Sequence, residues 1–485
     1  MIFNSVTFLL FLVAVVILYW ILPRGPRLWM IFGSSLVFYG FWRVEYTALL
    51  LVSTVVDYVA GLAIHRSADP GRRRVYLGVS LATNLGLLFY FKYLMFFAGQ
   101  GAGLLRTLGF DVAEPAFSIV LPLGISFYTF QTISYTVDVY RGFIAPERNF
   151  ALYGCYVTFF PQLVAGPILR AREVISQLDR RPAFRLDDLA VGVRRVLSGL
   201  FLKVVLADNL APLVDTGFEQ SAATLSAVDV WTLAFLFGFQ IYFDFSGYSH
   251  IAIGCARMMG IAFPENFDFP YLASSPRDFW RRWHISLSSW IRDYLYLPLA
   301  GERVQDRSTG GLAAAVDPGG ESRRTRALFL TWAIMGLWHG ASWNFVLWGV
   351  YHAVLVYGYR RLAPLVEGAG NGVRTALGFG LTLPLAMLGW IPFRAQGLAD
   401  TFAMLAKVVD PREYLWLGMR ENNYLVAALT LAVVVLAYAV REHGAPRLAR
   451  YPVAFTVARS AAFGAMIALV FVFLRPINQF IYFQF

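Results

Sequence analysis

The chain has 485 residues, of which 58% are hydrophobic and 15% are charged, and its mean hydropathy is +0.57. A soluble domain has about 45–50% apolar and about 25% charged residues, so this composition excludes an ordinary soluble protein and predicts a polytopic membrane protein. The net charge of +11 comes largely from basic residues in short connections between apolar runs, a pattern that orients membrane proteins and does not indicate a nucleic-acid partner.

Apolar runs recur along the whole chain, so we expect one membrane-embedded domain over residues 1–485. A spanning helix needs about 20 apolar residues, and the runs predict an all-α protein with about ten to twelve transmembrane helices plus buried or re-entrant helices. The runs are 5–22, 28–42, 46–64, 75–98, 117–140, 150–166, 189–207, 230–260, 327–358, 375–393, 423–440 and 455–475.

Charged residues in the connections predict how the chain is oriented. The first five residues carry no basic side chain, whereas the first connection has Arg24 and Arg27 and the connection 65–74 is strongly basic. Cytoplasmic connections carry the excess of Lys and Arg. We therefore expect 65–74 in the cytoplasm and 99–116, which has two acidic residues against one arginine, on the other side.

Three segments lack a normal spanning pattern. The arginine-rich segment 167–188 and the segment 301–325, rich in Gly and charge, are predicted to be cytoplasmic amphipathic or loop elements. The segment 261–300 has three early prolines and then mixes aromatic residues with Arg, Asp and His. At membrane depth such a segment is tolerated only inside the protein or beside a watery cavity, so we expect it to be buried or re-entrant.

The most unusual residues of this segment lie between 279 and 292. If the segment is one helix, Arg281, His284, Ser288 and Arg292 are offset by 3, 7 and 11 residues and share one face. A face with these cations and an imidazole suits a polyphosphate such as coenzyme A, with Arg281, Arg282 and Arg292 as candidate ligands of the phosphates. In the alternative, the arginines extend to phospholipid headgroups.

His339 is the second candidate for proton chemistry. It lies about 12 residues into the apolar run that begins at Ala327, which places it near the middle of the membrane. A neutral imidazole is the usual general base near neutral pH, and Gly340 would let a ligand approach the backbone. The alternative is a core histidine bonded to a helix carbonyl.

Other buried polar residues fit structural roles better. Asp244, in a segment with Ser and Gly, is expected to pair with His284 or with an arginine of the cationic face. Structural roles are also expected for His352, Asp57, Lys92 and Asp138. The chain has no phosphate-binding glycine loop, no H-E-x-x-H site and no G-x-S-x-G elbow, and its six His and two Cys residues have no metal-ligand spacing.

Three long motifs carry a resemblance to a known family. DFWRRWHISLS (278–288), WIRDYLYLP (290–298) and GLWHGASW (336–343) resemble the signatures of the membrane-bound O-acyltransferase family. PENFDFP (264–270) and the final FIYFQF (480–485) resemble the branch that O-acetylates bacterial alginate. The likeness extends over the whole chain.

This resemblance implies a ring of helices around a tunnel in the bacterial inner membrane. His339 matches the family's catalytic residue and His284 its second well-kept polar position, with supporting roles expected for Asp244, Ser288 and Trp343. Acetyl-CoA would enter from the cytoplasm as a substrate, with no tightly bound cofactor or metal. His339 would take the proton of an acceptor hydroxyl, while His284 would orient that hydroxyl or stabilise the oxyanion.

The resemblance also implies a periplasmic partner protein that passes the acetyl group to the polysaccharide. One departure concerns His250, where the alginate branch usually has Asp. Other acceptors stay open, among them cellulose, peptidoglycan, teichoic acid and proteins, as do longer acyl groups and the oligomeric state. A transporter or flippase would also explain intramembrane charges, but it would not explain both histidine motifs.

Overall fold

The computed structural model describes residues 1–113, 118–180, 182–302, 320–366, 371–474 and 480, which form helices and connecting loops. This confirms the predicted all-α class. The α-helices up to residue 258 are α1 (Val6–Ile21), α2 (Arg24–Gly40), α3 (Thr47–Arg66), α4 (Pro70–Leu88), α5 (Leu94–Thr107), α6 (Ile125–Arg141), α7 (Phe150–Thr158), α8 (Ala171–Asp179), α9 (Leu186–Leu200), α10 (Asp208–Phe218) and α11 (Ala227–Met258).

The second half of the chain begins with short helices and ends with longer ones. Its α-helices are α12 (Pro276–Arg282), α13 (Ile285–Ile291), α14 (Leu297–Ala300), α15 (Glu321–His339), α16 (Trp343–Val366), α17 (Asn371–Leu388), α18 (Ile391–Arg394), α19 (Leu398–Val409), α20 (Glu421–Ala439), α21 (Ala445–Leu448) and α22 (Pro452–Phe473). Wider π-helical turns are η2 (Phe89–Tyr93), η3 (Phe201–Ala207), η6 (Arg292–Tyr296) and η9 (Val440–Gly444). Short 3₁₀ turns are η1 (Val44–Tyr46), η4 (Ala222–Thr224), η5 (Pro270–Leu272) and η8 (Pro411–Tyr414).

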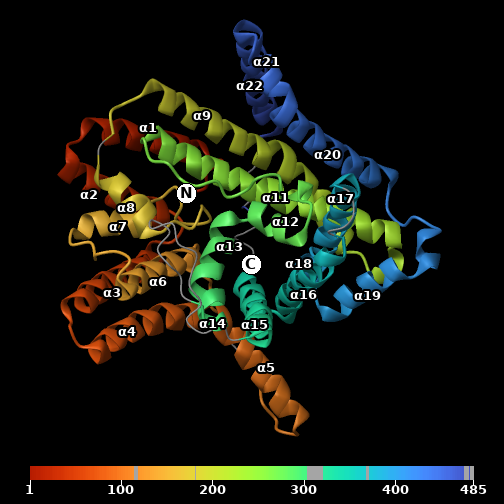
Figure 1. Ribbon diagram of the computed structural model, residues 1–485, viewed down its shortest axis with the longest axis horizontal. Helices are drawn as coiled ribbons and strands as arrows, with labels where there is room; N and C mark the ends of the chain where they lie inside the picture. The colour runs from red at the N-terminus through yellow and green to blue at the C-terminus, as the bar shows by residue number, and fades with distance from the viewer. Residues whose placement is uncertain (114–117, 181, 303–319, 367–370, 475–479, 481–485) are drawn as a thin grey trace.

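Long helices lie around a centre that contains α12, α13, α15 and α16 (Figure 1). Among the described residues, five continuous helical stretches are long and apolar enough to cross a membrane, which agrees with a multi-pass membrane protein. They are Val44–Arg66, Pro70–Thr107, Ala227–Met258, Glu421–Leu448 and Pro452–Phe473. The larger number of ten to twelve spans stays a prediction, as does a central tunnel.

Helix α11 is the buried helix of this arrangement. In its most apolar 18-residue window 83% of the residues are buried, whereas in α22 none are. Its contact with α9 is made close by facing glycines. A Cβ atom on Gly199 would lie 2.4 Å from the carbonyl oxygen of Gly247, and one on Gly192 would lie 2.7 Å from that of Gly254. Small residues of this kind let membrane helices approach backbone to backbone.

Several predicted runs are interrupted in the structure. The run 150–166 contains only the short helix α7, followed by a buried loop. The segment 167–188, expected as an amphipathic or loop element, contains α8 and the start of α9. Of the predicted loop 301–325, residues 303–319 lie outside the described residues, and 321–325 are the first turns of α15, so the loop prediction was wrong for those turns.

A buried polar network joins α3, α4 and α6. The carboxyl of Asp57 accepts hydrogen bonds from Ser80 and Thr136, and from Asn84 Nδ2 at 2.7 Å. The amide oxygen of Asn84 accepts in turn from Ser53 at 2.6 Å and from Thr132 at 3.2 Å. The structural pairing expected for Asp57 is therefore present.

We predict that Asn84→Ala destabilises this helix packing. It removes one donor from the Asp57 carboxyl and the acceptor of the Ser53 hydroxyl, while Thr132 keeps the carbonyl of Thr129 as an acceptor. A buried unsatisfied polar group costs about 1–3 kcal/mol. The measurement is the free energy of unfolding in detergent, compared with Asn422→Ala, which truncates an exposed asparagine. Equal stability of the two variants would show that the network does not hold these helices together.

Candidate active site

His339 is the last residue of α15, at the tip of a helical hairpin formed with α16. The apolar run 327–358 is therefore not one continuous helix, because the chain turns back at 340–342. The two helices touch closely at Gly336 and Gly349, where a Cβ atom would lie 2.1 Å from a carbonyl oxygen of the other helix. The space beside Gly340 is filled by the ring of Phe345, so this glycine serves packing and does not leave room for a ligand.

Hydrogen bonding defines the tautomer of the His339 side chain. Nδ1 lies 2.7 Å from the carbonyl oxygen of Met335, one turn earlier in α15. A carbonyl oxygen can only accept, so Nδ1 carries the proton and Nε2 carries the lone pair. The residue is only 7% exposed, and its ring packs edge-on against Trp348 and Phe393 at 4.7 and 5.4 Å. The bond to a helix carbonyl that is expected of a core histidine is thus present, and it leaves Nε2 as a proton acceptor.

His284 lies between two helices instead of on the face of one. Helix α12 ends at Arg282 and α13 begins at Ile285, and His284 has a φ of +41° in the left-handed region. This conformation is uncommon for a residue with a side chain and is often found at functional sites. The prediction that Arg281, His284, Ser288 and Arg292 share one helix face was therefore wrong, since helical spacing does not continue through the break.

Asn266 holds this break, and the sequence interpretation missed its role. Its Oδ1 accepts from the backbone N–H and the hydroxyl of Ser286 at 3.2 and 2.9 Å, and lies 3.1 Å from His284 Nδ1. Its backbone oxygen accepts from the N–H of Ile285 at 2.9 Å. Because Oδ1 already accepts from an N–H, it is the amide oxygen, so Nδ1 of His284 carries the proton. The only sequence signal was the position of Asn266 within PENFDFP.

Aromatic side chains pack around His284 and His339 and connect the two residues. Trp338 lies edge-on to His339 at 4.9 Å. Phe127 of α6 lies nearly parallel to His284 at 6.4 Å and edge-on to Trp338 at 6.0 Å, while Phe245 of α11 lies edge-on to His284 at 4.6 Å. His284 and His339 therefore come from distant segments into one apolar centre.

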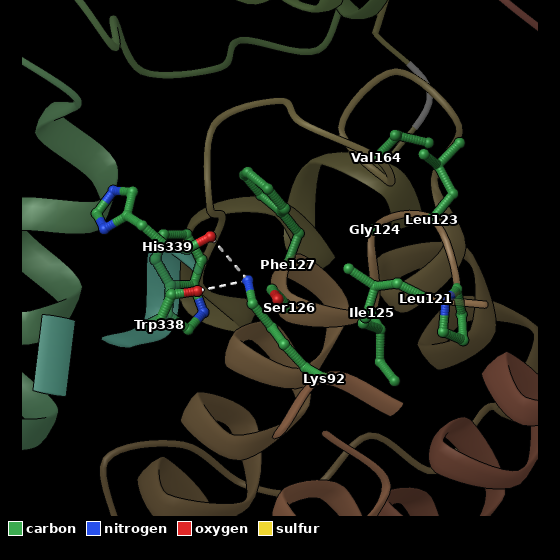
Figure 2. A pocket seen from close by; sticks show the side chains of 11 residues that line it. Lys92, Leu121, Leu123, Gly124, Ile125, Ser126, Phe127, Val164, Trp338 and His339 are labelled. Carbon is green, nitrogen blue, oxygen red and sulfur yellow. Dashed lines mark hydrogen bonds between the residues drawn. The ribbon is translucent and has the colours of Figure 1, made fainter. Parts of the chain in front are cut away.

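A cavity of about 60 Å³ lies beside the end of α15. It is lined by Lys92, residues 121–127, Val164, Trp338 and His339. Figure 2 shows the backbone of His339 on the side of Lys92 and its imidazole directed away from the ammonium group. The volume holds a few water molecules or a group as small as acetyl.

The three candidate arginines are distributed over separate elements. Arg281 is exposed near the end of α12. Arg282 forms ion pairs with Asp278 at 3.0 Å and Asp268 at 3.9 Å. Arg292 pairs with Asp293 at 2.7 Å, and its side chain is 42% exposed. No continuous cationic stripe joins them.

The expected supporting residues each have a bonding partner of their own. Asp244 pairs with Lys203 at 2.6 Å, whereas its pairing with His284 or with an arginine stays a prediction. The hydroxyl of Ser288 donates to the carbonyl of Trp283 at 3.2 Å. Trp343 is 49% exposed and donates to Gln100 at 3.1 Å.

Two further predicted residues have structural neighbours. His352 is buried between Trp280 and Trp348 at 5.0 and 4.9 Å, in keeping with a structural role. His250 accepts a hydrogen bond from Arg195 at 2.9 Å through Nδ1, because a guanidinium can only donate. Within the described parts of the chain, no three His, Cys, Asp or Glu side chains form a group that could hold a metal ion.

Comparison with known proteins gives the family. The model of the membrane-bound O-acyltransferase family matches residues 147–390, which include both histidines. "Probable alginate O-acetylase AlgI" of Azotobacter vinelandii is 38% identical over 91% of this chain and 84% of its own length. "Peptidoglycan O-acetyltransferase" of Helicobacter pylori is 35% identical over 80% of this chain and 74% of its own length.

"Teichoic acid D-alanyltransferase" of Bacillus subtilis is more distant, with 28% identity over 51% of this chain and 60% of its own length. The segment 147–390 that the family model matches contains the two histidine motifs, the Asn266 loop and the hairpin of α15 and α16. The chain is therefore an O-acyltransferase that belongs to the membrane-bound O-acyltransferase family.

Proposed function

We propose that this chain transfers an acetyl group from cytoplasmic acetyl-CoA across the bacterial inner membrane. A periplasmic partner protein receives the group and passes it to an exopolysaccharide, for which alginate is the first candidate. The similarity to alginate O-acetylases over nine-tenths of the chain supports this acceptor. The reaction uses acetyl-CoA as a substrate and needs no tightly bound cofactor.

The tautomer of His339 is the observation that carries the mechanism. Its Nε2 lone pair accepts the proton of the acceptor hydroxyl while the hydroxyl oxygen attacks the thioester carbon. The C–O bond forms, the C–S bond breaks, and the coenzyme A thiolate leaves with the proton from the imidazolium. The apolar rings around His339 keep the imidazole neutral before the reaction, because a buried charge in such surroundings is costly.

His284 orients the hydroxyl in this scheme. With Nδ1 donating to Asn266, its Nε2 is an acceptor in the neutral form, so it suits alignment of the attacking O–H better than donation to an oxyanion. The left-handed backbone and the three hydrogen bonds to Asn266 Oδ1 hold the ring in place. Precise alignment of reacting groups accounts for a large part of enzymatic rate enhancement.

The donor phosphates are assigned to the arginines of the central segment. Arg281 is exposed and Arg292 keeps much of its guanidinium accessible, so both can reach a polyphosphate. Arg282 is paired with Asp278, so we expect it to contribute less to phosphate binding.

Peptidoglycan is the second candidate acceptor, because a peptidoglycan O-acetyltransferase is 35% identical over 80% of the chain. The acetyl content of exopolysaccharide and of peptidoglycan, isolated from the same cells with and without the gene, separates the two. Loss of acetyl groups from the exopolysaccharide alone is the result expected for alginate.

We predict that His339→Ala lowers acetyl transfer by about a hundred- to ten-thousandfold, the usual contribution of a positioned general base. The measurement is thiol release from acetyl-CoA by purified protein with its partner present. His352→Ala is the matched control, since this histidine is buried in the same hairpin but is not assigned to the reaction. Normal turnover by folded His339→Ala would remove this residue from the mechanism.

We predict that Arg281→Gln and Arg292→Gln each raise the KM for acetyl-CoA about ten- to a hundredfold, because a charge-assisted hydrogen bond contributes about 1.5–3 kcal/mol. Arg282→Gln should show a smaller rise together with lower thermal stability, since its ion pairs are lost. Arg194→Gln, whose Nε bonds a carbonyl of its own helix, is the control. Arginines that only contact lipid headgroups would leave the donor KM unchanged in all variants.

A further inference from the structure

The end of α15 is held by side chains from another part of the chain. The last four carbonyls of an α-helix have no partner within the helix. The ammonium group of Lys92 donates to the carbonyls of Trp338 and His339 at 2.6 and 3.0 Å, as Figure 2 shows. The hydroxyl of Tyr93 donates to the carbonyl of Leu337 at 3.2 Å. Three successive carbonyls thus find their donors on two adjacent residues.

The two donors come from an irregular part of their own helix. Lys92 and Tyr93 end the π-helical turn η2 between α4 and α5. A π turn is wider than an α turn and changes the direction of the side chains, and such turns are frequent at functional sites. A regular helix would direct consecutive side chains about 100° apart.

The charge of Lys92 is compensated by the helix end. The described residues contain no Asp or Glu in an ion pair with Lys92. The negative end of the α15 dipole and the ring of Trp338, 5.8 Å from Nζ, take the place of a carboxylate. The structural pairing expected for Lys92 is therefore a contact with the backbone of the residue that we assign as the base.

We infer that Lys92 is a positioning residue for His339; this inference rests on the proposed function. The imidazole of His339 donates a hydrogen bond to the carbonyl of Met335. His339 is also the final residue of α15, and the chain is most prone to fray at the end of a helix. Lys92 fixes that final residue through two carbonyls. Lys92 acts through the backbone of His339, because its ammonium group lies at the carbonyl while the imidazole is directed away from it (Figure 2).

The test is a kinetic series with acetyl-CoA as the varied substrate. Lys92→Met should lower kcat about ten- to a hundredfold, because small misplacements of a catalytic group cost about that much. The KM for acetyl-CoA should change less than about twofold, since donor binding is not altered. Lys92→Arg keeps a charged donor and should recover most of the lost kcat. Lys407→Met is the matched control, because it removes a lysine of α19 that is paired with Glu413.

Melting curves of the same samples distinguish a positioning role of Lys92 from a purely structural one. A purely structural lysine would lower the melting temperature but leave kcat per folded molecule unchanged, which would overturn the inference. An unchanged kcat with a raised donor KM would overturn it as well. If Lys92→Met does not fold, Lys92→Gln is measured against the same two criteria.

His339→Ala keeps the two claims separate. Loss of activity in His339→Ala with full kcat in Lys92→Met would refute the positioning role and leave the proposed function intact. Full activity in His339→Ala would remove His339 from the mechanism, and with it the positioning role of Lys92. Failure of the wild-type protein, with its partner present, to release thiol from acetyl-CoA would refute the proposed function itself.

Discussion

The hydrogen bond from Nδ1 of His339 to the carbonyl of Met335 is the interaction on which the site depends. It assigns the proton to one ring nitrogen and leaves the other as an acceptor, in a setting where an imidazolium would be costly. The bond forms because α15 runs regularly up to residue 339, which places the imidazole beside the carbonyl one turn earlier. The hairpin with α16, the glycine contacts at 336 and 349, and the donors Lys92 and Tyr93 all maintain that helix end.

A polar group inside a membrane protein must find its partner within the protein, and other parts of the molecule show this as well. Asp57 has donors from α4 and α6, and Asp244 has the ammonium group of Lys203. Asn266 joins the connection before α12 to the start of α13 and thereby stabilises the left-handed residue His284. These contacts keep the surrounding helices in register, so two histidines 55 positions apart can share one apolar centre.

Sequence alone predicted the all-helical membrane class, the family and the burial of both histidines, because composition and long motifs carry these properties directly. It did not predict the break at His284, since spacing arguments assume a continuous helix and the left-handed residue ends one. It did not predict the ion pair of Asp244 with Lys203, because the two residues are 41 positions apart and the packing of α11 against η3 brings them together. Lys92 and Asn266 bind the backbone or side chains of distant loops, and no local pattern marks such contacts.

The central claim is that acetyl transfer takes place at Nε2 of His339, with His284 on the same reaction centre. The most direct measurement is a cryo-electron microscopy structure of the protein with a thioether analogue of acetyl-CoA, which cannot transfer its acyl group. We expect the acyl end of the analogue beside His339 Nε2 and the phosphates near Arg281 and Arg292. An analogue whose acyl end lies away from both imidazoles would contradict it.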